Sequence, residues 1–284
     1  MRRHLFSVVA AAVGSAVLAG SGLPARAADP LSARGAPAPV LPSMVSPGLI
    51  VTLTGNALVG PTYPGSDEVG VLAYPSLSFR RVGEPKRFTT PDDGLTLPFY
   101  DTPAFRVGAV GRFRGGRYLE TDRRLFGLDD VRWAVEPGLF AEFWPVSFLR
   151  TRVEVRRGFN GHEGFVADLG ADLVQRFGAA TFSVGPRVAL GDGEFARTYF
   201  GVTAAESAIN RLLPPYRPSG GVTSVGALAA LSVDWSERWS TTVSASYARL
   251  VGDAAESPIV RQVGSKDQFT VGASVSYSFA LDGW

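Results

Sequence analysis

The chain has 284 residues, and none of them is cysteine. Without cysteine no disulfide can form, so an exported protein of this kind must be held together by a large core or by a closed, hydrogen-bonded sheet. The absence also excludes anchoring as a lipoprotein, which requires a processed N-terminal cysteine.

Long apolar runs are also missing beyond the first 27 residues. The longest, Val225 to Val233, has nine residues and includes Gly226 and Ser232, whereas a membrane-spanning helix needs about 18 or more. Yet hydrophobic residues make up 45% of the chain and charged residues only 19%. A transmembrane β-barrel reconciles these facts, because its apolar side chains face lipid at every second position and never form a long run.

An excess of either charge is lacking as well. The formal net charge is +2, and residues 1–27 carry three arginines and no acid, so the remainder has +2 minus 3, or −1. A nearly neutral chain without a basic tract gives no support to nucleic-acid binding.

The N-terminus has the pattern of a cleaved secretory signal. Arg2 and Arg3 precede a short apolar run, and Ala25-Arg26-Ala27 places small residues at the cleavage site. We expect the general secretory route to export this chain. The expected division is a signal peptide at 1–27, a Pro- and Ala-rich periplasmic linker at 28–48 and a single barrel domain at 49–284.

The clearest strand pattern runs from Phe269 to Phe279. Its odd-numbered positions are apolar and its even-numbered positions are small or hydroxylic, so the strand has one face of each kind. Its length is about what a tilted strand needs to cross the hydrocarbon core of a bilayer. A strand packed over a soluble core would show the same alternation, so the rest of the chain decides between the two.

The same alternation recurs along the chain from Leu49. It predicts an all-β, antiparallel, up-and-down transmembrane barrel of about twelve strands, with ten as the alternative. The third strand, Leu95–Tyr100, and the ninth, Glu194–Gly201, have the weakest pattern. An even count with both ends in the periplasm puts loops 202–221 and 252–266 outside and the connection 115–130 on the periplasmic side.

Charged residues occur in the middle of these strands, on the face opposite the apolar one. In a barrel that face lines the lumen; the alternative is a solvated polar face. Neighbouring strands carry opposite charges that can pair across the lumen, which predicts a narrow, filled interior. The residues of this lumen charge ladder are Arg106, Arg112, Glu136, Glu142, Arg150, Arg152, Glu154, Asp168 and Asp172.

Three short motifs occur in order along the predicted barrel. They are Tyr63-Pro64-Gly65-Ser66-Asp67, then Tyr199-Phe200-Gly201 followed by Tyr216, and finally Gly252-Asp253 followed by Ser257-Pro258. Together, on an exported chain with barrel periodicity, they resemble the MltA-interacting protein family (MipA/OmpV) from about Leu49 to the C-terminus.

The resemblance implies a protein of the Gram-negative outer membrane. It also implies a scaffold that holds murein-hydrolysing and murein-synthesising enzymes, so a lytic transglycosylase and a penicillin-binding protein are implied partners, besides outer-membrane lipid and lipopolysaccharide. The alternatives are a small channel or porin-like protein and a surface or adhesion protein. The family supplies no catalytic residues to carry over.

Little in the sequence supports catalysis. Beyond the leader, His162 is the only histidine, and it lies in a Gly-rich turn where we expect it to be solvated rather than to act as a base. A single histidine without cysteine argues against a zinc or iron site. The acidic pairs Asp92-Asp93 and Asp129-Asp130 are expected to be solvated loop charges, with binding of calcium or of a cation that bridges lipopolysaccharide as the alternative. We therefore expect no enzyme activity, no metal and no cofactor.

Overall fold

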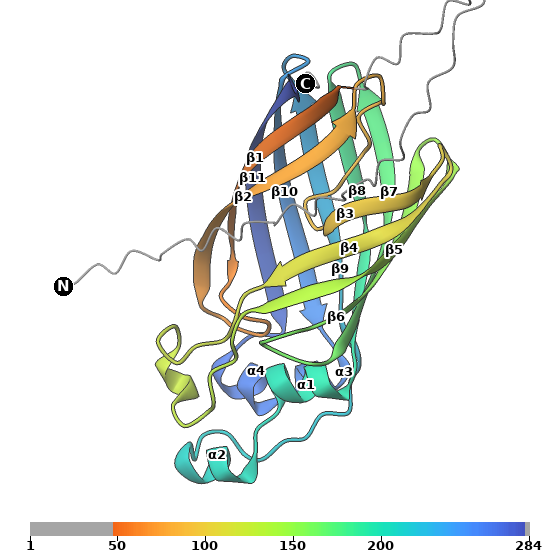
Figure 1. The fold of residues 1–284 in the computed structure, drawn as a ribbon. Helices are drawn as coiled ribbons and strands as arrows, with labels where there is room; N and C mark the ends of the chain where they lie inside the picture. The colour runs from red at the N-terminus through yellow and green to blue at the C-terminus, as the bar shows by residue number, and fades with distance from the viewer. Residues whose placement is uncertain (1–47, 282–284) are drawn as a thin grey trace, which may run out of the picture. The chain divides into compact units, whose positions relative to one another are not determined.

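A computed structural model describes residues 48–281, which form one antiparallel sheet curled into a nearly closed barrel (Figure 1). The eleven strands are in the order β2-β1-β11-β10-β9-β8-β7-β6-β5-β4-β3, so the first strand pairs with the last. The antiparallel all-β barrel predicted from the alternation is thereby confirmed. The strands are β1 (Leu49–Pro61), β2 (Val69–Arg81), β3 (Leu95–Asp101), β4 (Phe105–Arg114), β5 (Ala134–Val146), β6 (Leu149–Arg157), β7 (Phe165–Phe177), β8 (Ala180–Gly191), β9 (Gly221–Asp234), β10 (Trp239–Leu250) and β11 (Asp267–Leu281).

The outer face of the barrel is apolar. On β11, Phe269 is 64% exposed and Val275 is 49% exposed, and apolar residues of the same parity are exposed on the other strands. The alternate residues face the lumen, where hydroxyls bond across strands, as between Thr54 Oγ1 and Ser276 Oγ at 2.8 Å. Because side chains alternate along each strand, this one pattern produces both a lipid-compatible surface and a polar interior.

The segment predicted as a ninth strand is helical, and that part of the strand assignment is wrong. Helix α1 (Gly193–Phe200) begins after Asp192, whose side chain accepts a hydrogen bond from the Phe195 amide at 2.9 Å. Phe195 and Tyr199, four residues apart, are buried on one side of the helix. Residues 48–281 therefore contain eleven strands, an odd number between the expected twelve and the alternative of ten.

Five long connections meet at one end of the barrel, the lower end in Figure 1, which we call the loop end. They are residues 62–68, 115–133, 158–164, 192–220 and 251–266. They contain η1 (Arg123–Leu125), α1, α2 (Ala204–Ile209), α3 (Gly252–Glu256) and α4 (Pro258–Val263). Short connections at 102–104, 147–148, 178–179 and 235–238 form the other end, the turn end.

The connection 115–133 belongs to the loop end, which corrects the sequence-based assignment of 115–130 to the side opposite loops 202–221 and 252–266. Its Leu125 packs in one buried cluster with Leu213 and Ile259 from those two loops. The sequence-based assignment assumed that each strand runs opposite to the strand before it and that residues 194–201 form a strand. Neither assumption holds.

Strands β2 and β3 are the two edge strands of the sheet. Both run from the loop end to the turn end: β2 follows the loop-end connection 62–68, and β3 is antiparallel to β4 and precedes the turn-end connection 102–104. The chain leaves β2 at the turn end, so residues 82–94 carry it back through the lumen to the start of β3. We call residues 82–94 the inserted segment. Pro75 and Pro98 interrupt the two edge strands, and proline offers no backbone N–H for an edge to leave unpaired.

The expected signal peptide at 1–27 and all but the last residue of the expected linker at 28–48 lie outside the described residues. Among residues 48–281, no helix has the length and apolar character needed to span a membrane.

Candidate functional site: the charged lumen and its cap

The charged residues of β4–β8 lie opposite one another in the sheet. Arg106 and Arg152 both face Glu142 in the strand register, from the strands on its two sides. Arg150 faces Asp172 on the next strand. Because directly opposite side chains are the closest cross-strand neighbours, the register itself brings opposite charges together.

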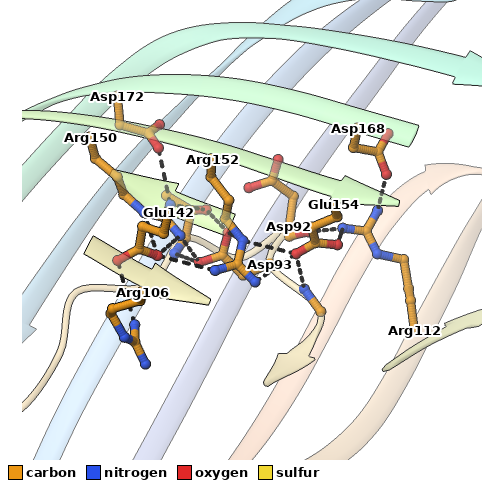
Figure 2. Close-up of polar contacts among 12 residues, drawn as sticks. Asp92, Asp93, Arg106, Arg112, Glu142, Arg150, Arg152, Glu154, Asp168 and Asp172 are labelled. Atoms are coloured by element: carbon orange, nitrogen blue, oxygen red, sulfur yellow. Dashed lines mark hydrogen bonds and ion pairs between the residues drawn. The ribbon is translucent and has the colours of Figure 1, made fainter. Parts of the chain in front are cut away.

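Arg150 occupies the centre of this network, with a side chain only 1% exposed (Figure 2). Its guanidinium donates to Glu142 Oε2 at 2.9 and 3.0 Å, and to Asp172 Oδ2 at 3.1 Å. It also donates to Asp93 Oδ2 at 2.7 Å and to Thr90 Oγ1 at 3.3 Å. A buried arginine needs such partners on every side, since an unpaired buried charge is strongly unfavourable.

A second group of ion pairs lies nearer the loop end. Arg112 donates to Glu154 Oε2 at 3.2 Å and to Asp168 Oδ2 at 3.1 Å. Arg156, fully buried, contacts the same two carboxylates and donates to Glu136 Oε2 at 3.1 Å. The nine ladder residues proposed from the sequence thus lie in one connected network, together with Arg114, Arg156 and Arg187.

Asp92 and Asp93 are inside the barrel, and the expectation that they are solvated loop charges is wrong. Arg187 donates to Asp92 Oδ2 at 2.6 Å. Arg150 and Arg152 contact Asp93 at 2.7 and 3.4 Å (Figure 2). The Asp93 side chain is 10% exposed and that of Asp92 is 37% exposed. No local sequence signal separates these aspartates from ordinary turn residues, because what holds them is a set of arginines from three distant strands.

His162 is buried, and the expectation that it is a solvated turn residue is wrong. Its Nε2 lies 2.9 Å from Glu136 Oε1, and its ring packs against Phe195 and Tyr199 of α1. Its Nδ1 has no hydrogen-bond partner within residues 48–281. His162 therefore connects the lumen network to the loop end and forms no pair with a nucleophile there.

The residues of the three family motifs, far apart in sequence, gather at the loop end. Tyr63 donates from its hydroxyl to Asp122 Oδ2 at 3.0 Å, and Asp67 pairs with Arg124. Gly65 donates its N–H to Gln268 Oε1 at 3.0 Å. Ser66 forms a β-bridge with Gly264 and is 2% exposed. The first motif therefore ties the β1–β2 loop to the loops before β5 and β11.

The second and third motifs meet each other. The Ser257 hydroxyl is fully buried and donates to the Phe200 carbonyl at 2.7 Å. The Tyr216 hydroxyl donates to the Asp253 carbonyl at 2.9 Å. The remaining motif positions serve helix ends: Gly201 caps α1, Gly252 begins α3 with φ of +53°, and Pro258 begins α4. We call this assembly of loops the cap.

The cap has an apolar interior. One buried cluster joins α1, α3 and α4 with the barrel rim through Val166, Phe195, Tyr199, Phe200, Leu250 and Val260. A second joins Tyr63, Leu125, Leu213 and Ile259. These clusters lie across the loop end of the lumen, so the cap is a small packed core rather than a set of solvated loops.

Charges at the cap are held by specific partners. Hydrogen bonds from Arg124 lower the pKa of Asp67. Burial raises the pKa of Asp122, but hydrogen bonds from Arg124 and Tyr63 outweigh burial and lower it below its ordinary value. Burial raises the pKa of Tyr199 to about 12. The carboxylates of the cap are thus stabilised in their charged form, and the tyrosine in its neutral form.

Two cavities border the network. A cavity of about 20 Å³ lies among the inserted segment and Arg112, Arg150 and Arg187, and one of about 130 Å³ lies beneath the cap beside Arg114 and Phe195. A volume of about 10–15 Å³ accommodates a single water. The described residues contain no group of three His, Cys, Asp or Glu side chains suited to a metal ion.

An antiparallel barrel with an apolar outer face and a polar lumen defines a transmembrane β-barrel of the outer-membrane class. The chain belongs to the family described as MltA-interacting protein MipA, whose sequence profile matches residues 53–279. It is therefore a protein of the Gram-negative outer membrane, in a family of barrels rather than of enzymes.

Other comparisons are more distant. Outer membrane protein Omp26La of Vibrio anguillarum is 36% identical over 115 residues, a match that covers 40% of this chain and 39% of that protein. The KdgM porin is 10% identical with a TM-score of 0.37, covering 81% of this chain and 99% of that one. The COG4313 outer membrane channel from Pseudomonas putida F1 is 10% identical with a TM-score of 0.43, covering 84% and 100%. Neither structural similarity supports an argument about function.

Proposed function

We propose that this protein is a non-conducting barrel that serves as an interaction scaffold for murein-cleaving and murein-synthesising enzymes. The observation that carries the proposal is the dense ion-pair network on the β4–β8 side of the lumen, together with the cap. Arg150, Arg156, Glu136 and Asp172 are each at most 1% exposed, and the cap lies across the loop end. A pore needs a continuous aqueous path, and the paired side chains and the cap oppose one.

The nature of the partners is supported by the family's description as interacting with MltA. Short turns of outer-membrane barrels face the periplasm and long loops face outward. We therefore propose that the turn end contacts a lytic transglycosylase and a penicillin-binding protein, and that the barrel has no catalytic role of its own.

The test is affinity recovery of partners from a mild-detergent extract of the outer membrane. The bait is the mature protein, and an unrelated porin from the same membrane serves as the control bait. Recovery of a lytic transglycosylase or a penicillin-binding protein with this barrel alone is the expected result. Recovery of only lipopolysaccharide and general porins, or equal recovery by both baits, contradicts the scaffold role.

A small channel is the second candidate, favoured by the lumen wall that β1 and β9–β11 contribute. That wall carries serine and threonine hydroxyls that are partly exposed, including Thr52, Ser244 and Ser276. Stepwise conductance of the reconstituted wild-type protein would establish the channel and displace the non-conducting scaffold.

A further inference from the structure

The inserted segment enters the barrel as a peptide bound to its interior. Its first residues, 82–86, are exposed near the turn end, where Lys86 Nζ lies 2.5 Å from Asp234 Oδ1. Deeper in, Phe88 stacks edge-on against Trp144, and Thr90 is 5% exposed. The segment therefore passes from solvent at the turn end to the charge network, where Thr90 is buried and Asp92 and Asp93 are partly exposed.

Four arginines from strands β4, β6 and β8 converge on two adjacent aspartates of this segment. Arg187 contacts both carboxylate oxygens of Asp92, at 2.6 and 3.4 Å. Arg150 and Arg152 contact opposite oxygens of Asp93, and Arg112 donates to the Asp92 carbonyl. Paired donors of this kind match the geometry of carboxylates, which makes the arrangement an anion-binding site rather than a general basic surface.

The charges of the wall and of the segment are complementary. The β4–β8 wall contributes seven arginines to the network against five carboxylates, so it carries a net excess of two positive charges although each arginine contacts a wall carboxylate. Asp92 and Asp93 supply two negative charges. At the turn-end side, Arg87 and Asp101 add one charge of each sign and leave this balance unchanged. The two aspartates therefore neutralise the net positive charge of the wall.

The segment also fits its site by shape. The Thr90 amide and hydroxyl both donate to the Asp93 carboxylate at 2.9 Å, and the Gly94 amide donates to Glu154 Oε1 at 3.1 Å. A Cβ on Gly94 would lie 2.4 Å from Val110 Cγ2. The binding site therefore recognises a compact turn with two acidic residues followed by glycine.

Only one side of the lumen holds the aspartates. The opposite wall, from β9–β11 and β1, carries small residues such as Ser244, Gly272 and Ser274, and its hydroxyls bond mainly to one another. No strand on that side contributes a charged contact to Asp92 or Asp93 within the described residues. A segment bound on one face beside small side chains can leave without displacing the barrel wall.

We propose that Arg112, Arg150, Arg152 and Arg187 form a binding site for an acidic peptide, occupied in this structure by the chain's own Asp92-Asp93 turn. An acidic segment of a partner protein, entering from the turn end, can replace it. The inserted segment then acts as an internal competitor that keeps the site closed until such a partner is present. The inference does not depend on murein enzymes being the partners, because the test ligand is the chain's own sequence.

The test uses the full barrel carrying Asp92→Asn and Asp93→Asn, and a fluorescent peptide with the sequence of residues 89–94, Thr-Thr-Pro-Asp-Asp-Gly. Fluorescence anisotropy in detergent measures binding. We expect the peptide to bind the double variant at least about tenfold more tightly than the wild type, and the Asn-Asn version of the peptide to bind neither. Glu163→Gln, which removes an exposed carboxylate that pairs with Arg157 and contacts no residue of the inserted segment, is the control variant and should behave like the wild type.

A second measurement shows that the internal turn has moved. Because the chain has no cysteine, a single Thr90→Cys reports access to the site through its rate of maleimide labelling. Labelling should be slow in the otherwise wild-type barrel and faster in the double variant. Both proteins should migrate as folded barrels when unheated samples are run in gel electrophoresis. Equal labelling, equal peptide affinity in wild type and double variant, or equal binding of the Asn-Asn peptide overturns the proposal.

Discussion

Replacing Arg150 with methionine tests the energetic importance of the lumen network. The change keeps most of the side-chain volume but removes five hydrogen bonds, to Glu142, Asp172, Asp93 and Thr90. Removing one partner of a buried ion pair destabilises a protein by about 3–5 kcal/mol, because the remaining charges stay buried. Each of the three carboxylates keeps a second arginine, so we expect a loss of about 3 kcal/mol, at the lower end of that range.

Arg157→Met is the matched control. Arg157 is on the same strand, but its side chain is 48% exposed and its pair with Glu163 spans 3.6 Å, so the change should alter stability by less than about 1 kcal/mol. The assay is urea unfolding of the barrel reconstituted in lipid vesicles, followed by tryptophan fluorescence. Equal stability of Arg150→Met and Arg157→Met would refute the reasoning, because the network would then contribute nothing beyond an exposed ion pair.

Three further predictions concern the cap. Gly65→Ala should loosen the β1–β2 loop, because the new Cβ would lie 2.6 Å from Val260 Cγ2. Gly83→Ala is the control, since Gly83 has a similar positive φ but nothing within 4 Å of its added Cβ. Amide hydrogen exchange of residues 62–68 compares the two variants. Ser257→Ala removes a buried hydrogen bond to the Phe200 carbonyl and the N-terminal cap of α4. The free energy of local opening of this loop should fall by about 1–2 kcal/mol. Protease cleavage within 251–266 should therefore be faster, with no change in the barrel strands. The lowered pKa of Asp122 means that its contribution is complete above about pH 4 and disappears as pH falls through the folded value. Amide protection factors at 119–126, which are corrected for the intrinsic pH dependence of exchange, should therefore fall on acidification. An Asp122→Asn barrel that shows the same fall would refute this assignment.

The strand pattern was predictable because it is local. Alternation of apolar and polar residues on β11 follows directly from the backbone geometry of a strand, and so does the parity of the charges on β4–β8. The helical segment α1 shows how the same method fails. Phe195 and Tyr199 have the same parity in a strand and also the four-residue spacing of a helix, and the Asp192 cap was the signal that could have separated the two.

The positions of Asp92, Asp93 and His162 were not predictable from local pattern. Each lies in a stretch with the composition of a loop, and each is held in the lumen by partners more than 20 residues away, such as Arg187 for Asp92 and Glu136 for His162. The nine ladder residues named from the sequence comprise four arginines and five carboxylates, so they gave no sign that an acidic turn enters the lumen.

Single-channel recording in planar lipid bilayers tests the central claim, that the lumen is closed by its own side chains. We expect reconstituted wild-type protein, shown to be folded by its electrophoretic mobility, to produce no stepwise conductance above that of protein-free bilayers. Regular current steps that scale with salt concentration would contradict it, because they require a continuous aqueous path where the structure has buried ion pairs.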